Sequence, residues 1–320
     1  MVLLNIPYVQ QKIALLVSGE LSSLLHTEVS VRRVNLGLLN RIIVDDIYIA
    51  DQQKNTLLEV PRLSAKFDLG ELVRSKLVIH NIQLYKGQIY LSQKDSLSQP
   101  NYRFIIDALS SDDTTSTSGD INLRINSILI RHSRIRYDLL SAEKTPGIFN
   151  PNHIDLDELR VNISLKALLN DSINTTVRQL SFNENNSRFA LKNLAFKLVA
   201  NREAFTLSRF NLELPASKME LDTLNATYDL NAKDVLKTLQ FKGGINDSYV
   251  TLQDLKCFIP SMEHFADRLN LNAKISGNAQ EIMLSKFKLN SDNNDILVES
   301  NCHVRYPFNP EMSFIDCNMP

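Results

Sequence analysis

The chain has 320 residues, of which 43% are hydrophobic and 22% are charged, so it can bury apolar surface and is not a disordered tail. Its 35 basic and 36 acidic side chains nearly cancel. This balance argues against nucleic-acid binding, because proteins of that class usually carry an excess of Lys and Arg. The length allows two ordinary domains or one extended domain.

Metal and cofactor sites are not expected. The three cysteines, Cys257, Cys302 and Cys317, are odd in number and form no C-x-x-C pair. A disulfide framework or a zinc cluster is therefore not predicted. The cysteines do not indicate whether the protein resides in an oxidising or a reducing compartment. The six histidines are scattered without the spacing of metal ligands.

The first segment predicts an amphipathic helix. The stretch IPYVQQKIALLVSGELSSLLHT spans residues 6–27, and Pro7 suits a first helical turn. Apolar residues recur there at helical spacing, namely Val9, Ile13, Leu16, Val17 and Leu24. We assign residues 1–27 to this N-terminal helix.

Beyond residue 27 the apolar residues alternate as in strands, but the alternation is interrupted repeatedly in the same way. In FALKNLAF (189–196) two polar residues separate two alternating pairs, giving the pattern h-x-h-x-x-h-x-h. The pattern occurs eleven times, starting at Val29, Ile42, Leu58, Leu77, Leu123, Ile154, Phe189, Phe205, Met219, Val250 and Ile282. The irregular spacing between these starts excludes a solenoid of fixed period.

An extra residue in a flat strand would send the second apolar pair to the other face of the sheet. A β-bulge or a tight corner avoids this, and all four apolar side chains then share one face. The sequence therefore predicts a mainly β fold: an elongated, strongly curved, antiparallel or mixed sheet shaped as a groove, with a few short helices. A β-sandwich with bends at the sheet corners is the alternative.

Breaks in the pattern divide the chain. We expect a first β-segment over residues 28–109, a polar linker over 110–120 and a second β-segment over 121–320. Short helices or turns are predicted in LGELVRS (69–75), AKDVLKTL (232–239) and SMEHFADRL (261–269). The stretch SAEKTPGIFNPN (141–152) predicts a loop, and Gly243–Gly244 is a hairpin candidate.

Catalytic motifs are weak. Ser141 and Lys144 match S-x-x-K, and SDN begins at Ser291, but the first pair lies in a Pro- and Gly-flanked loop and no K-T-G follows. A phosphate-binding glycine loop is also missing from the sequence. We therefore expect no enzymatic activity.

Two charged stretches have a functional and a structural interpretation. The sequence RHSRIRY places Arg131, Arg134 and Arg136 close together, and they could grip anionic headgroups or form the polar face of a strand. The second interpretation is favoured. Asp155 and Asp157 could be paired catalytic carboxylates, but alternation places them on a solvated face.

Several phrases resemble the amino-terminal region of the TamB family within the AsmA-like group. One is the "IP-x-VQ" start, and another is a bent-strand phrase over Leu72–Leu84. The stretches LSFNENNSRFALKNLAFKL and VTLQDLKCFIPSM are also similar to units of the long TamB-type proteins. The resemblance implies a fragment that lacks a preceding membrane anchor and a distant carboxy-terminal region.

This resemblance implies a function in lipid transport. The full protein would be anchored in the inner membrane of a Gram-negative bacterium and would cross the periplasm. It would carry phospholipid toward the outer membrane and support outer-membrane assembly, with a barrel partner bound through the missing carboxy-terminal region. Neither a cofactor nor nucleic acid is implied. The alternative is a closed β-sandwich that serves as a binding or adhesion module.

In a lipid groove the repeated apolar pairs would contact acyl chains. The candidate residues are Val31, Val34, Leu77, Ile79, Ile82, Leu84, Phe189, Leu191, Leu194, Phe196, Phe205, Leu207, Phe210, Leu212, Leu252, Leu284 and Phe287.

Overall fold

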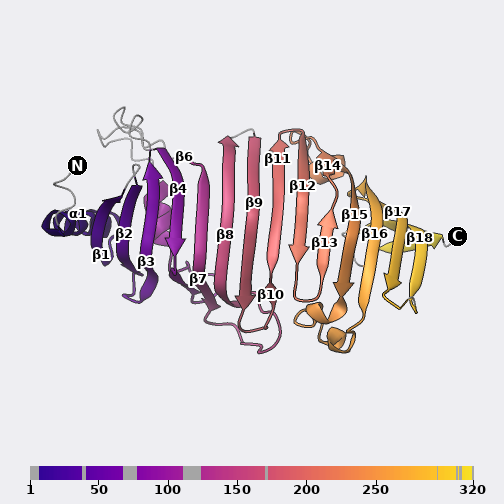
Figure 1. The fold of residues 1–320 in the computed structure, drawn as a ribbon, viewed down its shortest axis with the longest axis horizontal. Coiled ribbons are helices and arrows are strands. Elements are labelled where there is room, and N and C mark those ends of the chain that lie inside the picture. The colour runs from indigo at the N-terminus through magenta and orange to yellow at the C-terminus, as the bar shows by residue number, and fades with distance from the viewer. Residues whose placement is uncertain are drawn as a thin grey trace. The chain divides into compact units, whose positions relative to one another are not determined.

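The computed structural model describes residues 7–37, 41–67, 78–110, 124–169, 172–293, 295–307, 309 and 312–318. Its described strands belong to one mixed sheet, accompanied by a few short helices (Figure 1). The prediction of a mainly β fold built on one mixed sheet is therefore confirmed. The chain forms two compact units, 1–162 with 182–188 and 163–181 with 189–320, which we call unit 1 and unit 2.

Unit 1 holds the helices α1 and α3 and the first strands. Their bounds are α1 Pro7–Leu25, β1 Val29–Gly37, β2 Arg41–Ala50, β3 Thr56–Phe67, β4 Val78–Tyr85, β5 Gln88–Gln93, α3 Arg103–Ser110, β6 Arg124–Ile125 and β7 Ser127–Leu139. Strands β1 to β4 pair antiparallel in chain order. Strands β4 and β5 both run parallel to β7, which makes the sheet mixed.

Two long strands, β8 His153–Leu169 and β9 Ser172–Glu184, contribute residues to both units. The remaining elements belong to unit 2. They are β10 Ala190–Leu191, β11 Asn193–Asn201, β12 Ala204–Glu213, β13 Lys218–Leu221, β14 Leu224–Thr227, α4 Val235–Thr238, β15 Gln240–Thr251, η2 Leu252–Leu255, η3 Pro260–His264, β16 Arg268–Asn278, β17 Glu281–Ser291, β18 Leu297–Arg305 and β19 Phe314–Asn318. The described strands from β11 to β19 pair antiparallel.

The interrupted alternation corresponds to β-bulges. In the β11–β12 pair, Ala195 lies opposite Asn211 and Lys197 lies opposite Ser208, so β12 has one more residue than β11 between these positions. Within this interval Arg209 has a φ of 55°, in the left-handed region. Two residues on one strand facing one on its partner, with a local bend, define a bulge.

The bulge keeps the apolar residues on one face. Leu207 lies opposite Leu198, and Leu212 lies opposite Leu194. Leu194 and Leu198 are an even number of residues apart on a regular strand, so they share a face. Leu207 and Leu212 therefore also share that face although they are an odd number of residues apart.

Left-handed residues mark the same position in other matches of the pattern. The second polar residue of the central pair has a positive φ at Asp46, Glu158 and Lys286, as it does at Arg209. At His80 the register between β3 and β4 shifts instead. At other matches the strand is divided in two, as between β10 and β11 and between β13 and β14.

Two predictions in the second β-segment are wrong. The match at Val250 is not a bent strand, because β15 ends at Thr251 and the 3-10 helix η2 follows. Gly243–Gly244 is not a hairpin but lies inside β15. A Cβ on Gly243 would be 2.9 Å from the Cδ1 of Leu224, so the glycine permits close approach of the neighbouring strand β14.

The other predicted helices and loops agree with the structure to different extents. Helix α1 is confirmed with its end at Leu25, but its predicted apolar face is wrong in part, because Leu16 and Leu24 are exposed while Ala14 and Leu25 are buried. Helix α4 lies inside 232–239. The helix predicted over 261–269 is a 3-10 helix at Pro260–His264, and β16 already begins at Arg268. The stretch 69–75 and most of the linker 110–120 lie outside the described residues. Helix α3 was not predicted.

Helix α1 covers the outer edge of β1. The backbone N–H of Val31 donates to the Oγ of Ser18 (2.9 Å), and the N–H of Val29 donates to the Oγ of Ser22 (3.0 Å). Ser22 also donates to the carbonyl of Val29 (3.2 Å). The two serines are one helical turn apart and satisfy backbone groups that an edge strand otherwise leaves open.

The opposite sheet edge carries a disulfide. Cys302 of β18 lies opposite Cys317 of β19, with a Cα–Cα distance of 4.1 Å, and the two are bonded. The expectation that the cysteines form no disulfide is therefore wrong for this pair. The sequence separation of 15 gave no signal, because only the strand register brings the two residues together.

The left-handed bulge residue gives a first prediction. Arg209→Gly should stabilise the protein or leave it unchanged, because glycine adopts a positive φ without the cost of about 1 kcal/mol that a side chain adds. The neighbouring Ser208→Gly should destabilise by about 0.5 to 1 kcal/mol, since it only weakens a strand. Urea unfolding measures both, and equal destabilisation would contradict the role of Arg209.

The edge contact gives a second prediction. Ser18→Ala should leave the Val31 amide without its acceptor, and Ser22→Ala should do the same for Val29. Amide hydrogen exchange should then accelerate at Val31 in the first variant and at Val29 in the second, so each variant is the control for the other. Unchanged exchange at both amides would show that the helix does not protect this edge.

Candidate functional site

In unit 2 the predicted groove residues form apolar rows across neighbouring strands. One row joins Leu198, Leu207 and Leu224, and a second joins Leu194, Leu212 and Met219. A further row runs through seven strands and ends at the disulfide edge, with the members Phe205, Ala226, Phe241, Gly277, Ile282, Val304 and Ile315.

The corner between β10 and β11 extends this face to the start of β10. The N–H of Lys192 donates to the carbonyl of Glu213 (2.9 Å), while Asn193 also lies opposite Glu213. Two residues therefore face one, as in a bulge, and both point to the polar side. Leu191 and Leu194, which flank them, point to the apolar side.

Most of these side chains are only half-buried. Leu194, Phe196, Phe205, Leu207, Phe210, Leu212, Leu284 and Phe287 all belong to this half-buried group. Leu191 is the exception among the predicted residues described in unit 2, at 7% exposure. In a closed sandwich the apolar side chains of two sheets interdigitate and lose contact with water. The face of unit 2 instead keeps its aliphatic and aromatic side chains partly open.

Unit 1 has comparable rows. Val34 lies opposite Val44, Val44 opposite Leu63, and Leu63 opposite Leu84, which in turn neighbours Ile130. The predicted residues Val34, Ile82 and Leu84 are half-buried, whereas Val31 is 8% exposed beside α1. Leu77 and the side chain of Ile79 lie outside the described residues.

Two predicted groove residues are described but do not lie in strands: Phe189 comes directly before β10, and Leu252 begins η2. Leu252 lies in the stretch where the strand pattern at Val250 fails. The sequence pattern counts alternation alone, and it did not indicate the 3-10 helix that follows β15.

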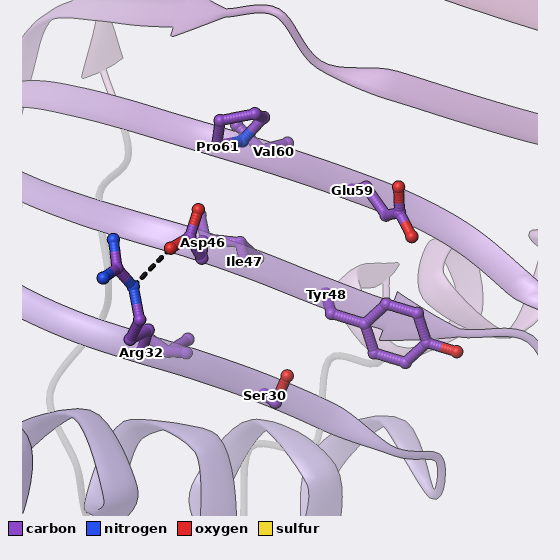
Figure 2. A pocket seen from close by; sticks show the side chains of 9 residues that line it. Ser30, Arg32, Asp46, Ile47, Tyr48, Glu59, Val60 and Pro61 are labelled. Carbon is purple, nitrogen blue, oxygen red and sulfur yellow. Dashed lines mark ion pairs between the residues drawn. The ribbon is translucent and has the colours of Figure 1, made fainter.

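A shallow pocket of about 380 Å³ lies on the polar side of β1, β2 and β3 (Figure 2). Arg32 faces Asp46 across the strands as an ion pair, and Tyr48 lies beside Glu59 on the next strand. Both members of the ion pair are largely exposed, so the pair contributes little stability. The pocket follows the bend at Asp46, and its lining offers no convergent set of catalytic groups.

A second hollow of about 580 Å³ lies beside the left-handed residues Lys86, His132 and Glu158. The Nδ1 of His132 lies 2.7 Å from the Oε2 of Glu158. This hydrogen bond lowers the pKa of the Glu158 carboxyl. Because both side chains are exposed to solvent, the pair is a surface contact between bent strands.

Two arginines of RHSRIRY, Arg134 and Arg136, bind a carboxylate of the protein itself. Arg134 donates from Nε and Nη2 to the two carboxylate oxygens of Asp155, at 2.7 and 2.5 Å, and Arg136 donates to the same carboxylate at 3.4 Å. Asp155 is 8% exposed, so its predicted place on a solvated face is wrong. Two guanidinium groups compensate the buried charge. The structural interpretation of Arg134 and Arg136 is therefore the better one.

The loop after β7 holds the serine and lysine of the S-x-x-K motif. Lys144 is exposed, with its Nζ 3.7 Å from the Oδ1 of Asp138. The buried ring of His153 anchors the loop, since its Nδ1 lies 2.8 Å from Asp138 and its Nε2 lies 3.0 Å from the carbonyl of Ala142. Nothing in the sequence pattern indicated this role for His153. Ser291, from the SDN motif, accepts a hydrogen bond from the N–H of Ile296 (3.0 Å).

Within the described part of the chain, no group of three or more His, Cys, Asp or Glu side chains is arranged to hold a metal ion. The same residues include no helix that is long and apolar enough to span a bilayer.

The Asp155 cluster gives a third prediction. Its hydrogen bond from Arg134 lowers the pKa of Asp155 against the opposing effect of burial. A carboxyl with a lowered folded-state pKa stabilises the protein above its unfolded pKa of about 3.9, and this stabilisation is lost as the pH falls through the folded-state pKa. Asp155→Asn should therefore cost about 1 to 3 kcal/mol at pH 7 and much less near pH 2.

Urea unfolding of Asp155→Asn between pH 7 and pH 2 measures this difference. Asp267→Asn, which removes an exposed carboxylate, is the matched control and should change stability little at any pH. A constant loss of stability over the whole pH range in Asp155→Asn would contradict the ion-pair explanation.

Comparison with known proteins found no match: no family model, no curated protein and no solved structure is similar to this chain.

Proposed function

We propose that the chain binds the alkyl chains of lipids along the apolar face of its sheet. In this proposal it is a section of a periplasmic lipid conduit of the TamB and AsmA-like type. It would carry phospholipid between the inner and outer membranes and support outer-membrane assembly. The inner-membrane anchor and the contact with a barrel partner would lie in segments outside this chain.

The observation that carries the proposal is the half-buried apolar face of unit 2. Rows of leucine and phenylalanine side chains continue from strand to strand without becoming fully buried. An alkyl chain needs an apolar wall and no polar partner, and each methylene group removed from water contributes about 0.8 kcal/mol. A continuous row of such side chains can therefore hold a chain without a closed pocket.

Two further observations support the setting. The disulfide between Cys302 and Cys317 suits an oxidising compartment such as the bacterial periplasm. The IP-x-VQ and bent-strand phrases resemble the TamB family, and this resemblance is the reason for proposing a lipid conduit. The alternative, an adhesion or binding module with a closed core, is disfavoured because a sandwich packs two sheets and the described strands pair into one.

Leu207→Asp tests the lipid-binding face and is the fourth prediction. Leu207 is half-buried between Leu198 and Leu224, so a carboxylate there can still reach water and the sheet should fold. We expect loss of binding by at least about tenfold, because the charge breaks the apolar row. Native mass spectrometry with phosphatidylethanolamine and phosphatidylglycerol measures the bound lipid, and circular dichroism reports the strand content.

Ser208→Asp is the matched control. Ser208 lies opposite Lys197 on the other face, so its replacement should leave lipid binding unchanged. Loss of folded protein with Leu207→Asp would indicate a closed core and favour the sandwich. Equal lipid binding by the wild type and both variants would exclude this face as the lipid site.

A further inference from the structure

The segment between β15 and β16, residues 252–267, crosses the strand ends on one side of unit 2 (Figure 1, orange). We call it the strap. It contains η2 and η3, and the N–H of Gln253 donates to the carbonyl of Phe265 (3.1 Å), which closes its base. The strap therefore begins and ends beside the same pair of strands while its middle part extends from the sheet.

Hydrogen bonds tie the strap to the turn between β12 and β13. The carboxylate of Asp254 accepts from the N–H of Ala216 (2.9 Å) and from the Oγ of Ser217 (2.7 Å). Next to it, the N–H of Thr251 donates to Ser217 (2.9 Å) and the Oγ1 of Thr251 donates to the carbonyl of Ala216 (3.0 Å). These bonds hold the strap across the ends of β12 and β13.

Beyond this turn the strap reaches the residue directly before β10. The ring of Phe258 meets the ring of Phe189 edge to face, with the centroids 5.4 Å apart. The adjacent Cys257 is 3% exposed. Phe189 comes directly before β10 and is two residues before Leu191 of the apolar face. Phe258 therefore lies beside the end of β10, next to the start of the apolar face.

The burial of Leu191 agrees with this cover. Leu191 is 7% exposed, while Leu194 and Phe196 on the same face are half-buried. The apolar face of unit 2 is thus half-buried along β11 and β12 and buried at Leu191 near the strap, while Phe258 keeps 45% of its surface exposed.

We propose that the strap is a stop at this end of the apolar face and that Phe258 determines how far a bound alkyl chain extends. The inference rests on the proposed lipid function and adds a specificity-determining residue to it. A chain lying along β11, from Leu198 past Leu194 to Leu191, runs toward Phe189 and meets the Phe258 ring. Methylene groups beyond that point find no further apolar wall.

The stop can be tested by measuring how the affinity for an alkyl chain depends on the length of that chain. Each methylene group that enters the apolar face should tighten binding about fourfold, from about 0.8 kcal/mol per group. In the wild type this gain should cease at one chain length, because additional groups meet the ring. In Phe258→Ala the space of the ring is free, so the gain should continue to longer chains.

Saturated fatty acids of increasing length, from ten to eighteen carbons, are suitable probes, with binding measured by calorimetry below their micellar concentrations. Phe265→Ala is the matched control, since Phe265 is about as exposed as Phe258 (54% and 45%) but lies at the base of the strap, where its carbonyl accepts from Gln253. It should keep the wild-type chain-length limit. Phe258→Leu, which retains an apolar side chain, should move the limit in the same direction by less, and it decides the question if the alanine variant does not fold.

The thiol of Cys257 reports the state of the strap. It is not in a disulfide and is almost fully buried, so a maleimide should react slowly with the folded wild type. Asp254→Ala removes the acceptor of two hydrogen bonds, and we expect faster labelling by at least about tenfold. Equal labelling rates in the wild type and Asp254→Ala would show that Asp254 does not hold the strap.

The outcomes separate this inference from the function on which it rests. If no fatty acid binds to the wild type or to any variant, the proposed function fails. If fatty acids bind and the chain-length limit is the same in the wild type, Phe258→Ala and Phe258→Leu, the lipid face stands and the stop at Phe258 is overturned.

Discussion

The two-residue period of a β-strand is the constraint on which this structure depends. Side chains alternate between faces, so an extra residue reverses the exposure of all that follow it. In β12 the chain absorbs this residue at Arg209 by adopting a left-handed backbone, and Leu207 and Leu212 remain on one side. The same device at Lys286 in β17 keeps Leu284 and Leu289 opposite Ile275 and Leu271. A face that is apolar over many strands follows from a few residues with positive φ.

At four bends of the repeated pattern the left-handed positions are occupied by Asp46, Glu158, Arg209 and Lys286, where glycine would be easier for the backbone. A charged side chain at a bend points into water and also discourages pairing with other sheets. The cost in backbone strain is small beside the apolar surface that the bend organises. Two of these bends carry surface charge pairs, Arg32 with Asp46 and His132 with Glu158.

Sequence reasoning recovered the fold where the information is local. Helix α1 is readable because its apolar spacing and Pro7 lie within one stretch, and the bends are readable because two polar residues interrupt an alternation. It failed where a residue's role depends on a neighbouring strand. Gly243 resembles a turn residue, but Leu224 across the sheet explains it. The bond between Cys302 and Cys317, the burial of Asp155 by Arg134 and the contact of Phe258 with Phe189 all require the register of strands that the sequence does not supply.

The disulfide has a mechanical consequence. Strand β19 has five exposed residues and pairs with β18 through a short ladder. Without a covalent link, tension on such a strand would break its hydrogen bonds to β18 one after another, beginning at the end of the strand. Cys317 is the next-to-last residue of β19, so its disulfide transfers the tension to β18 before the hydrogen bonds of β19 begin to break. Tension at this edge is then shared by the longer β17–β18 ladder, whose bonds must yield together rather than in turn.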